Sequence, residues 1–277
     1  MVYDLVEWIQ GAEDYYGNEL ETARVEKFWQ AARRELLTAL TIAQQGVELT
    51  LKGKIADVSP FLLITNFAEK AKLDGLDFGA FYTINESDIL KACSCISKNP
   101  LEEDVRNKFN EFRLIRNEIM HSDPIKYKTA PDIKKLAKKI VGYILFMSKK
   151  MYSTRWAKMR EEFIENSTRE ILLASPNSRL TLCVEVKRMI EFLDSDVVEE
   201  YFGVDKKGKA YYCPGCLDDC GNENEEFSEV KLAYLKSDTQ LYCPICDKVF
   251  NIHFGNRGCC SDNRVYVDLC VNCMDRI

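Results

Sequence analysis

The sequence predicts an all-α helical bundle followed by a small, zinc-stabilised module of the ribbon type. The bundle is indicated by apolar residues that recur at three- and four-residue steps through most of the first 165 positions, as on the buried face of a helix. The module is indicated by cysteine, because nine of the twelve cysteines lie between Cys213 and Cys273. We therefore divide the 277 residues into a helical bundle (1–165), a helical linker (166–204) and a cysteine-rich module (205–277).

Each expected helix has its own run of apolar residues. The first begins near Asn18 and continues to Leu51. The others are expected over 58–73, 86–96, 101–121, 130–166 and 178–201. Pro124 supports the end of the helix at 121, because a proline excludes the residue before it from helical conformation. Short connections between the helices favour an up-and-down bundle.

Composition excludes several classes of protein. Charged residues make up 30% and hydrophobic residues 46% of the chain, which is typical of a globular protein and not of a disordered one. The longest apolar run, Ile140 to Met147, is too short to span a bilayer. Acidic residues in the opening segment MVYDLVEWIQ argue against a signal peptide. We therefore expect a cytoplasmic protein that does not bind membranes.

Bulk charge gives no reason to expect nucleic-acid binding. The net charge is −6, from 38 basic and 44 acidic residues. The excess of acid lies toward the C-terminus, since residues 1–164 carry 25 basic and 24 acidic side chains. A phosphate-binding site in the bundle would therefore have to be local.

Three Cys-x-x-Cys pairs predict structural zinc: a first pair (Cys213/Cys216), a second (Cys243/Cys246) and a third (Cys270/Cys273). Two thiolates on one tight turn can approach the same tetrahedral Zn²⁺, and a second turn can supply the other two. Proline in the turns CPGC and CPIC presets the backbone of such a knuckle. One or two ions are expected.

The pairing of these ligands is open at this point. In one arrangement the first two pairs share an ion, and the third pair takes two ligands from Cys220, His253, Cys259 and Cys260. In the other, the second and third pairs share an ion, and the first pair and Cys220 hold the other. Vicinal Cys259 and Cys260 point in different directions, so only one of them is expected to bind a given ion. A catalytic zinc is disfavoured, because it usually has histidine ligands and an open position.

The helix expected over 101–121 carries a cation on its apolar face. Arg116 falls between the directions of Phe112 and Ile119, where it must snorkel, pair with an acid or face a partner surface. Asn117 lies beside it, and His121 is one turn further on the same side. A histidine near neutrality suits acid–base catalysis, and an arginine suits the negative charge of a phosphate. Together they predict a site for transesterification of RNA that needs no metal.

The segment Arg116-Asn117-Glu118-Ile119-Met120-His121 resembles the R-N-x-x-x-H form of the R-x4–6-H motif of the HEPN superfamily (higher eukaryotes and prokaryotes nucleotide-binding). The resemblance covers about residues 1–165 and implies a helical bundle that forms a homodimer. It implies that two motifs meet across the interface in one metal-independent endoribonuclease site, which leaves a 2′,3′-cyclic phosphate. Arg116 would then bind the scissile phosphate, Asn117 would orient it, and His121 would act as the acid or base.

Many HEPN proteins resemble toxins or effectors of stress and antiviral (phage) defence, so an antitoxin or an activating protein is a candidate partner. Arg113, Lys134 and Lys138 are candidate RNA contacts near the motif, although a solvated helix face explains the lysines equally well.

Two alternative functions remain for the chain. One is a catalytically silent HEPN adaptor whose zinc module binds RNA or a protein. The other is a zinc-dependent enzyme, which the shortage of histidine disfavours.

Overall fold

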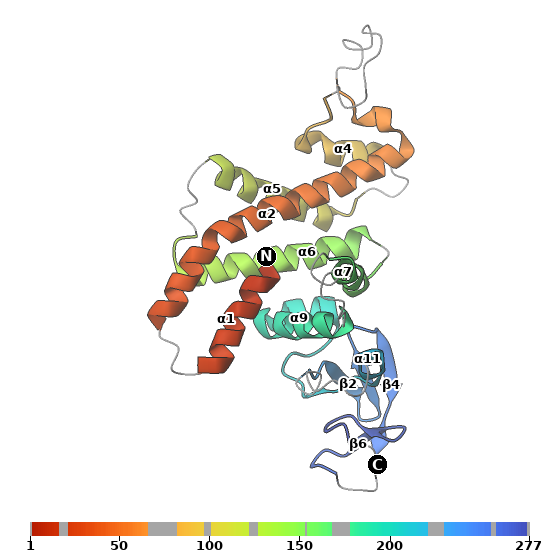
Figure 1. Cartoon of the computed structure of the whole chain (residues 1–277). Coiled ribbons are helices and arrows are strands. Elements are labelled where there is room, and N and C mark those ends of the chain that lie inside the picture. The colour runs from red at the N-terminus through yellow and green to blue at the C-terminus, as the bar shows by residue number, and fades with distance from the viewer. Residues whose placement is uncertain are drawn as a thin grey trace. The chain divides into compact units, whose positions relative to one another are not determined.

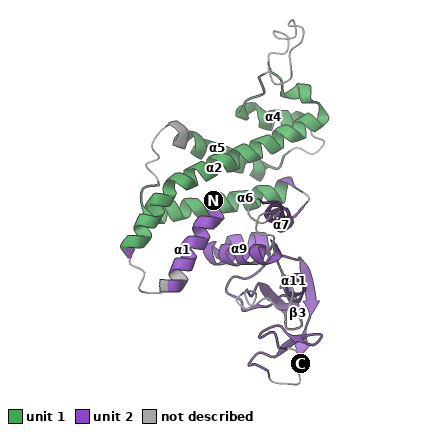
Figure 2. Cartoon of the chain, viewed as in Figure 1, with its two compact units in different colours: residues 1, 23–150 green, residues 2–22, 151–277 purple. Residues whose placement is uncertain are grey.

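The computed structural model describes residues 2–16, 22–65, 82–96, 101–121, 127–152, 154–167, 178–220, 230–255 and 259–275. The described chain is mostly helical, and small strands with two cysteine clusters lie toward the C-terminus (Figure 1). It forms two compact units: residues 1 and 23–150 make unit 1, and residues 2–22 and 151–277 make unit 2 (Figure 2). The described helices include none that combines the length and apolar character needed to cross a membrane.

Unit 1 is built from helices whose apolar faces form its core. Its described elements are α2 (Thr22–Val58), the 3-10 turn η2 (Pro60–Leu63), α4 (Glu86–Ile96), α5 (Glu103–His121) and α6 (Ala130–Met151). The most deeply buried side chains come from all four α-helices: Leu36, Leu40, Leu51, Ile55, Ile89, Phe109, Phe112, Ile133, Leu136, Ile140 and Tyr143. Their spacing of three and four residues along each helix places them on one face.

Tyr143 of α6 links two other helices of this core. The Phe112 ring of α5 stacks on the Tyr143 ring of α6, with centroids 3.8 Å apart and an interplanar angle of 9°. The Tyr143 hydroxyl donates a hydrogen bond of 2.6 Å to Oε1 of Gln44 in α2. Burial raises the pKa of Tyr143, which therefore stays a neutral donor. The helix that carries Arg116 thus packs on α6 through Tyr143, and the same tyrosine ties α6 to α2.

Side-chain caps explain where two of these helices begin. At the start of α4, the Asp88 backbone N–H donates to Oδ1 of Asn85 at 3.1 Å. At the start of α6, the hydroxyl of Thr129 accepts from the Asp132 N–H at 3.4 Å and donates to the Asp132 carboxylate at 2.6 Å. The cap at Asn85 places Glu86 in the first turn of α4, where a negative charge is favoured.

Unit 2 combines helices with two small sheets. The helices are α1 (Val2–Tyr16), α7 (Trp156–Glu165), α9 (Ser178–Phe192), α10 (Ser195–Phe202) and α11 (Pro214–Cys220). Helices α1, α7 and α11 all contact α9. Arg160 of α7 donates to both carboxylate oxygens of Glu185 in α9, at 2.8 and 2.6 Å. Helix α10 ends at Gly203, whose φ of 67° favours glycine.

The strands of unit 2 are short and antiparallel. The first sheet has the order β1 (Ala210–Tyr211), β2 (Ala233–Ser237), β3 (Gln240–Cys243) and β4 (Lys248–Asn251). The second has the order β5 (His253–Phe254), β6 (Arg264–Tyr266) and β7 (Leu269–Cys270). Cys243 is the last residue of β3 and Cys270 the last of β7, so each of these sheets delivers a Cys-x-x-Cys pair at a strand end.

The structure differs from the sequence prediction in four elements. Helix α1 was not predicted, although Val2, Leu5, Val6 and Ile9 have helical spacing and are buried. The helix expected over 130–166 is two helices, α6 and α7, because the backbone at Arg155 is extended. The helix expected over 178–201 is also two, since Asp194 is the extended residue before α10. Of the helix expected over 58–73, residues 60–63 form η2, and 66–73 lie outside the described residues.

The compact units also have other bounds than the predicted segments. Helices α1 and α7 lie within the predicted bundle of residues 1–165 but belong to unit 2, where they pack on α9. Helices α9 and α10, predicted as a linker (166–204), belong to the same unit as the cysteine-rich module. The reason is packing: α9 is buried along most of its length and serves as the core helix of unit 2.

Candidate functional site

Arg116 lies near the C-terminal end of α5, and its guanidinium Nη2 forms an ion pair with Oε1 of Glu86 in the first turn of α4. Both side chains are largely covered, with exposed fractions of 19% for Arg116 and 21% for Glu86. The sequence left three alternatives for this cation: snorkelling to solvent, pairing with an acid or facing a partner surface. The described structure shows pairing with an acid. The Arg116 Nε is buried without a hydrogen-bond partner among the described residues, which leaves the guanidinium only partly satisfied.

The other two members of the predicted trio are less fully defined. Asn117 follows Arg116 on α5 and is half-buried. His121 is the last residue of α5, so the helix ends where the sequence predicts, but the His121 side chain lies outside the described residues. The geometry that would unite Arg116, Asn117 and His121 therefore stays a prediction.

The candidate RNA contacts occupy two helices of unit 1. Arg113 lies one turn before Asn117 on α5 and is half-buried. Lys134 and Lys138 lie one turn apart on α6, and both are half-buried. A neighbouring acid offsets part of this basic region, because Glu111 of α5 pairs with Lys139 at 3.5 Å.

Sequence reasoning missed Glu86. Its position at the start of a helix is readable from the sequence, but its approach to Arg116 is not, because the two residues are far apart in the chain. Only the packing of α4 near the end of α5 brings them together.

The first two Cys-x-x-Cys pairs converge in unit 2. Cys213 and Cys216 come from the start of α11, and Cys243 and Cys246 from the turn between β3 and β4. The Sγ atoms of Cys213 and Cys246 are 3.5 Å apart, and those of Cys216 and Cys243 are 3.7 Å apart. All four sulfurs lie within 4.8 Å of one another. We call these four residues the first tetracysteine group.

A second tetracysteine group is formed by the third pair and the vicinal cysteines: Cys259, Cys260, Cys270 and Cys273. Sγ of Cys260 is 3.7 Å from that of Cys270, and Sγ of Cys273 is 3.5 Å from that of Cys259. Four thiolates at about 2.3 Å from a tetrahedral zinc ion would be separated by about 3.8 Å. Both groups therefore fit one tetrahedral metal ion each, held by four thiolates.

The structure decides between the two pairings left open by the sequence. The first and second pairs share a group, and the third pair joins Cys259 and Cys260. The expectation that only one of the vicinal cysteines serves a given ion was wrong, because the bend at Cys259 and Cys260 brings both sulfurs to the same centre. Neither Cys220 nor His253 belongs to a group among the described residues.

The second and third pairs have the same backbone turn. The N–H of Asp247, just after Cys246, donates to the carbonyl of Cys243 at 3.0 Å, and Asp247 has a φ of 55°. The N–H of Met274, just after Cys273, donates to the carbonyl of Cys270 at 2.9 Å, and Met274 has a φ of 64°. This left-handed residue closes each knuckle and turns both sulfurs of the pair to one side.

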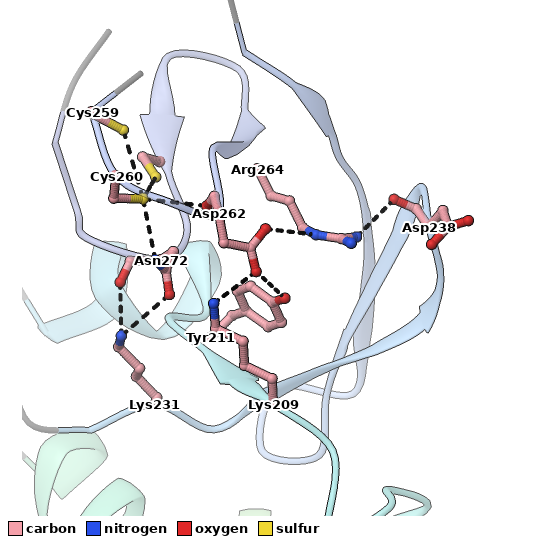
Figure 3. A network of polar contacts seen from close by, with 10 residues as sticks. Lys209, Tyr211, Lys231, Asp238, Cys259, Cys260, Asp262, Arg264 and Asn272 are labelled. Atoms are coloured by element: carbon pink, nitrogen blue, oxygen red, sulfur yellow. Dashed lines mark hydrogen bonds and ion pairs between the residues drawn. The ribbon is translucent and has the colours of Figure 1, made fainter. Parts of the chain in front are cut away.

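Polar side chains support the second group. The Asn272 amide donates to Sγ of Cys260 at 3.1 Å and lowers the pKa of that thiol to about 7, which favours the thiolate that a metal needs (Figure 3). Lys231 in turn donates to the backbone carbonyl of Asn272 at 2.8 Å. Asn272 is a residue inside the third Cys-x-x-Cys turn, and sequence reasoning did not assign it a role.

Asp262 joins the two sheets of unit 2. Its carboxylate accepts from Lys209 at 2.8 Å, from the Tyr211 hydroxyl at 2.6 Å and from Arg264 at 3.0 Å (Figure 3). Burial alone would raise the pKa of Asp262, but these donors lower it to about 2. Arg264 also reaches the carbonyl of Asp238 at 3.1 Å in the turn between β2 and β3. The second tetracysteine group is thus tied to the sheet that carries the first.

The first group has a neighbouring thiol of its own. Cys183 of α9 is buried and hydrogen-bonds Cys216, which lowers the pKa of Cys216. Cys183 also lies beside Cys220 at the end of α11. The packing of α9 on α11 therefore supplies a hydrogen-bond donor to this group of thiolates.

Comparison with known proteins assigns no family to this chain. No family model matches it, and no curated protein or solved structure shows significant similarity to it.

Proposed function

We propose that the protein is a metal-independent endoribonuclease of the HEPN type that acts as a homodimer. The observation that carries the proposal is the motif at the end of α5, where a mostly covered arginine is followed by Asn117 and by His121 as the final helical residue. A charged guanidinium is costly to hold in so covered a position, which favours a functional reason for its presence. The resemblance of the motif supplies the reaction.

In this reaction the ribose 2′-hydroxyl attacks the adjacent phosphorus. His121 accepts the proton of that hydroxyl or gives a proton to the departing 5′-oxygen. Arg116 holds the non-bridging oxygens and stabilises the charge of the phosphorane, and Asn117 orients the phosphate. The P–O5′ bond breaks, and the products are a 2′,3′-cyclic phosphate and a 5′-hydroxyl end.

Glu86 adds a condition to this mechanism. The carboxylate and the substrate phosphate compete for the same guanidinium, because both are anions that accept its N–H donors. Productive RNA binding therefore requires that Arg116 exchanges Glu86 for phosphate or keeps both on different N–H groups. Such a resting state suits a toxin or a phage-defence effector that an activating partner or an antitoxin controls.

Zinc is the metal we assign to both tetracysteine groups. Four thiolates without an open position are typical of structural zinc, which stabilises a small module and takes no part in the chemistry. The zinc module then selects the RNA or recruits a partner.

The test uses the purified full-length chain with RNA and a chelator concentration that leaves the structural zinc in place. Wild type, His121→Ala and Arg116→Ala are compared with Arg106→Ala, which removes an exposed arginine from the same helix. We expect cleavage and 2′,3′-cyclic phosphate ends from wild type and Arg106→Ala only. Size-exclusion chromatography and circular dichroism check that each variant is a folded dimer.

The alternative function, a catalytically silent HEPN adaptor, predicts a different result for the same four proteins. Neither wild type nor any variant would then cleave RNA, although all remain folded. Equal cleavage by wild type and His121→Ala would show that the activity belongs to another site or a contaminant.

A further inference from the structure

A hollow of about 360 Å³ opens in unit 2 between α9, the segment after α10 and strand β2. Besides two small residues, its lining consists of three lysines, one acid, one isoleucine and one tyrosine: Lys187, Lys206, Lys231, Glu191, Ile190 and Tyr234. A volume of this size lies within the range of small-molecule sites in proteins. Basic groups gathered in a concave surface are unexpected here, because the chain as a whole is acidic.

Two of the three ammonium groups are held in place by backbone carbonyls. Lys206 Nζ donates to the carbonyls of Glu191 and Leu193 at the C-terminal end of α9, at 2.7 and 2.6 Å. Lys231 Nζ donates to the carbonyl of Asn272 at 2.8 Å (Figure 3) and lies 4.8 Å from the centre of the Tyr212 ring. These side chains have already lost much of their rotamer freedom, so a bound anion would not have to order them.

The charge of the hollow favours an anion. Among its described lining residues Glu191 supplies the carboxylate, and two cations flank it: Lys187 at 3.9 Å and Arg188 at 3.8 Å. The three lining lysines therefore outweigh the one acid. Three lysine side chains around a single concavity match an anion with several charged oxygens, such as a phosphate chain, better than a single carboxylate.

The remaining lining suits an aromatic base. The Tyr234 side chain is largely buried, and burial raises its pKa to about 12, so its hydroxyl is a neutral donor at physiological pH. Ile190 adds an apolar side chain from α9; like Tyr234 it is largely buried, so each of the two presents only an edge to the hollow. Aromatic and aliphatic surfaces next to a basic groove are typical of sites at which a nucleobase packs.

We propose that this hollow binds a nucleoside phosphate, whose phosphate oxygens contact Lys187, Lys206 and Lys231 and whose base packs against Ile190 and Tyr234. A free nucleotide and a nucleotide within RNA share this chemistry. The site lies in unit 2 and involves none of Arg116, Asn117 or His121, so it goes beyond the proposed ribonuclease function and does not depend on it.

Two probes are measured against the full-length, zinc-loaded chain. The first is adenosine 5′-triphosphate, by isothermal titration calorimetry. The second is a fluorescein-labelled, single-stranded 2′-O-methyl RNA, by anisotropy over a series of salt concentrations. The methylated RNA cannot undergo attack by its own 2′-oxygen, so binding is measured whether or not the protein cleaves RNA.

The main variant is Lys187→Gln, because Lys187 pairs with Glu191 one turn along the same helix, at 3.9 Å, and glutamine keeps most of the side-chain length while removing the charge. Lys187→Gln/Lys231→Gln removes a second ammonium group. The matched control is Lys248→Gln, which removes the same charge from an exposed position on β4 of unit 2. Zinc content and thermal melting confirm that each variant is folded.

We expect Lys187→Gln to weaken binding about tenfold, the double variant more, and Lys248→Gln to leave it within about twofold. Loss of ATP binding in the hollow variants would identify a free nucleotide as the ligand. Loss of RNA binding only, with a salt slope reduced by about 0.7 for each lysine removed, would identify RNA. If neither probe binds, or if Lys187→Gln and Lys248→Gln behave alike, the proposal is overturned.

Discussion

Glu86 and Arg116 form an ion pair between the first turn of α4 and the end of α5, and each is only about a fifth exposed. The arginine that the sequence marks as a phosphate-binding residue is thus neutralised by a carboxylate of the same unit. A pair that is mostly covered is harder to separate than a surface pair, because neither charge is fully hydrated. This contact makes Glu86 a candidate regulator of the proposed active site.

Replacing Glu86 by Gln tests that role. We expect Glu86→Gln to tighten RNA binding several-fold, by about 1 kcal/mol, because the phosphate no longer competes with a carboxylate for Arg116. The same change lowers the free energy of unfolding by about 1 kcal/mol, since Arg116 loses its partner. Anisotropy with 2′-O-methyl RNA and urea unfolding measure the two effects. Glu103→Gln, an exposed acid of the first turn of α5, is the control; tightening by that variant as well would point to bulk charge.

Metal content distinguishes the two tetracysteine groups. Protein purified without chelators should carry about two zinc ions per chain, one for each group of four thiolates. Cys216→Ser and Cys270→Ser should each lower this to about one, measured by mass spectrometry of the metal. Cys95→Ser, which changes an exposed cysteine of α4 outside both groups, should retain about two. Full zinc content in either of the first two variants would contradict the ligand assignment.

The hydrogen bond between Tyr143 and Gln44 makes a separate prediction for the core of unit 1. Tyr143→Phe should lower the free energy of unfolding by about 1–3 kcal/mol, because Oε1 of buried Gln44 loses its donor. Gln44→Met/Tyr143→Phe should recover much of this loss, since no polar group is then left unpaired. Urea unfolding of wild type, Tyr143→Phe and the double variant gives the comparison; a double variant no more stable than Tyr143→Phe would refute this explanation.

Met274 closes the third Cys-x-x-Cys knuckle in a left-handed backbone conformation, which methionine does not favour. Met274 has a φ of 64°, which is costly for a residue with a side chain and free of cost for glycine. Met274→Gly should therefore relieve about 1 kcal/mol of backbone strain and slow the loss of zinc to a chelator. Met274→Val should accelerate zinc loss, because a β-branched residue is still less favourable at positive φ. The rate of zinc transfer to a colorimetric chelator measures both. Equal rates of zinc transfer from Met274→Gly and Met274→Val would show that the conformation of this turn does not limit metal retention.

Local patterns predicted much of the helical framework. The helix over 86–96 was predicted with the bounds that the structure has, and α5 differs from its prediction only at its first residues. The long predicted helices were wrong where a short break interrupts an apolar pattern that continues beyond it: one lies between Met151 and Trp156 and the other between Phe192 and Ser195. Arg155 and Asp194 are extended residues at these breaks. Periodicity reports which face is buried but not whether the backbone stays helical between two buried positions.

By itself, the sequence determined the chemistry that each segment can supply. Spacing of two residues between cysteines is a local property, so the three knuckles and their suitability as metal ligands were readable without a fold. The spacing of Arg116, Asn117 and His121 is also a local property, and their convergence on one side of α5 stays a prediction. Tertiary structure alone decided which knuckles lie in one group, that Cys259 and Cys260 both join one group, and that Glu86 pairs with Arg116. These are contacts between distant segments, and they depend on how helices and strands pack.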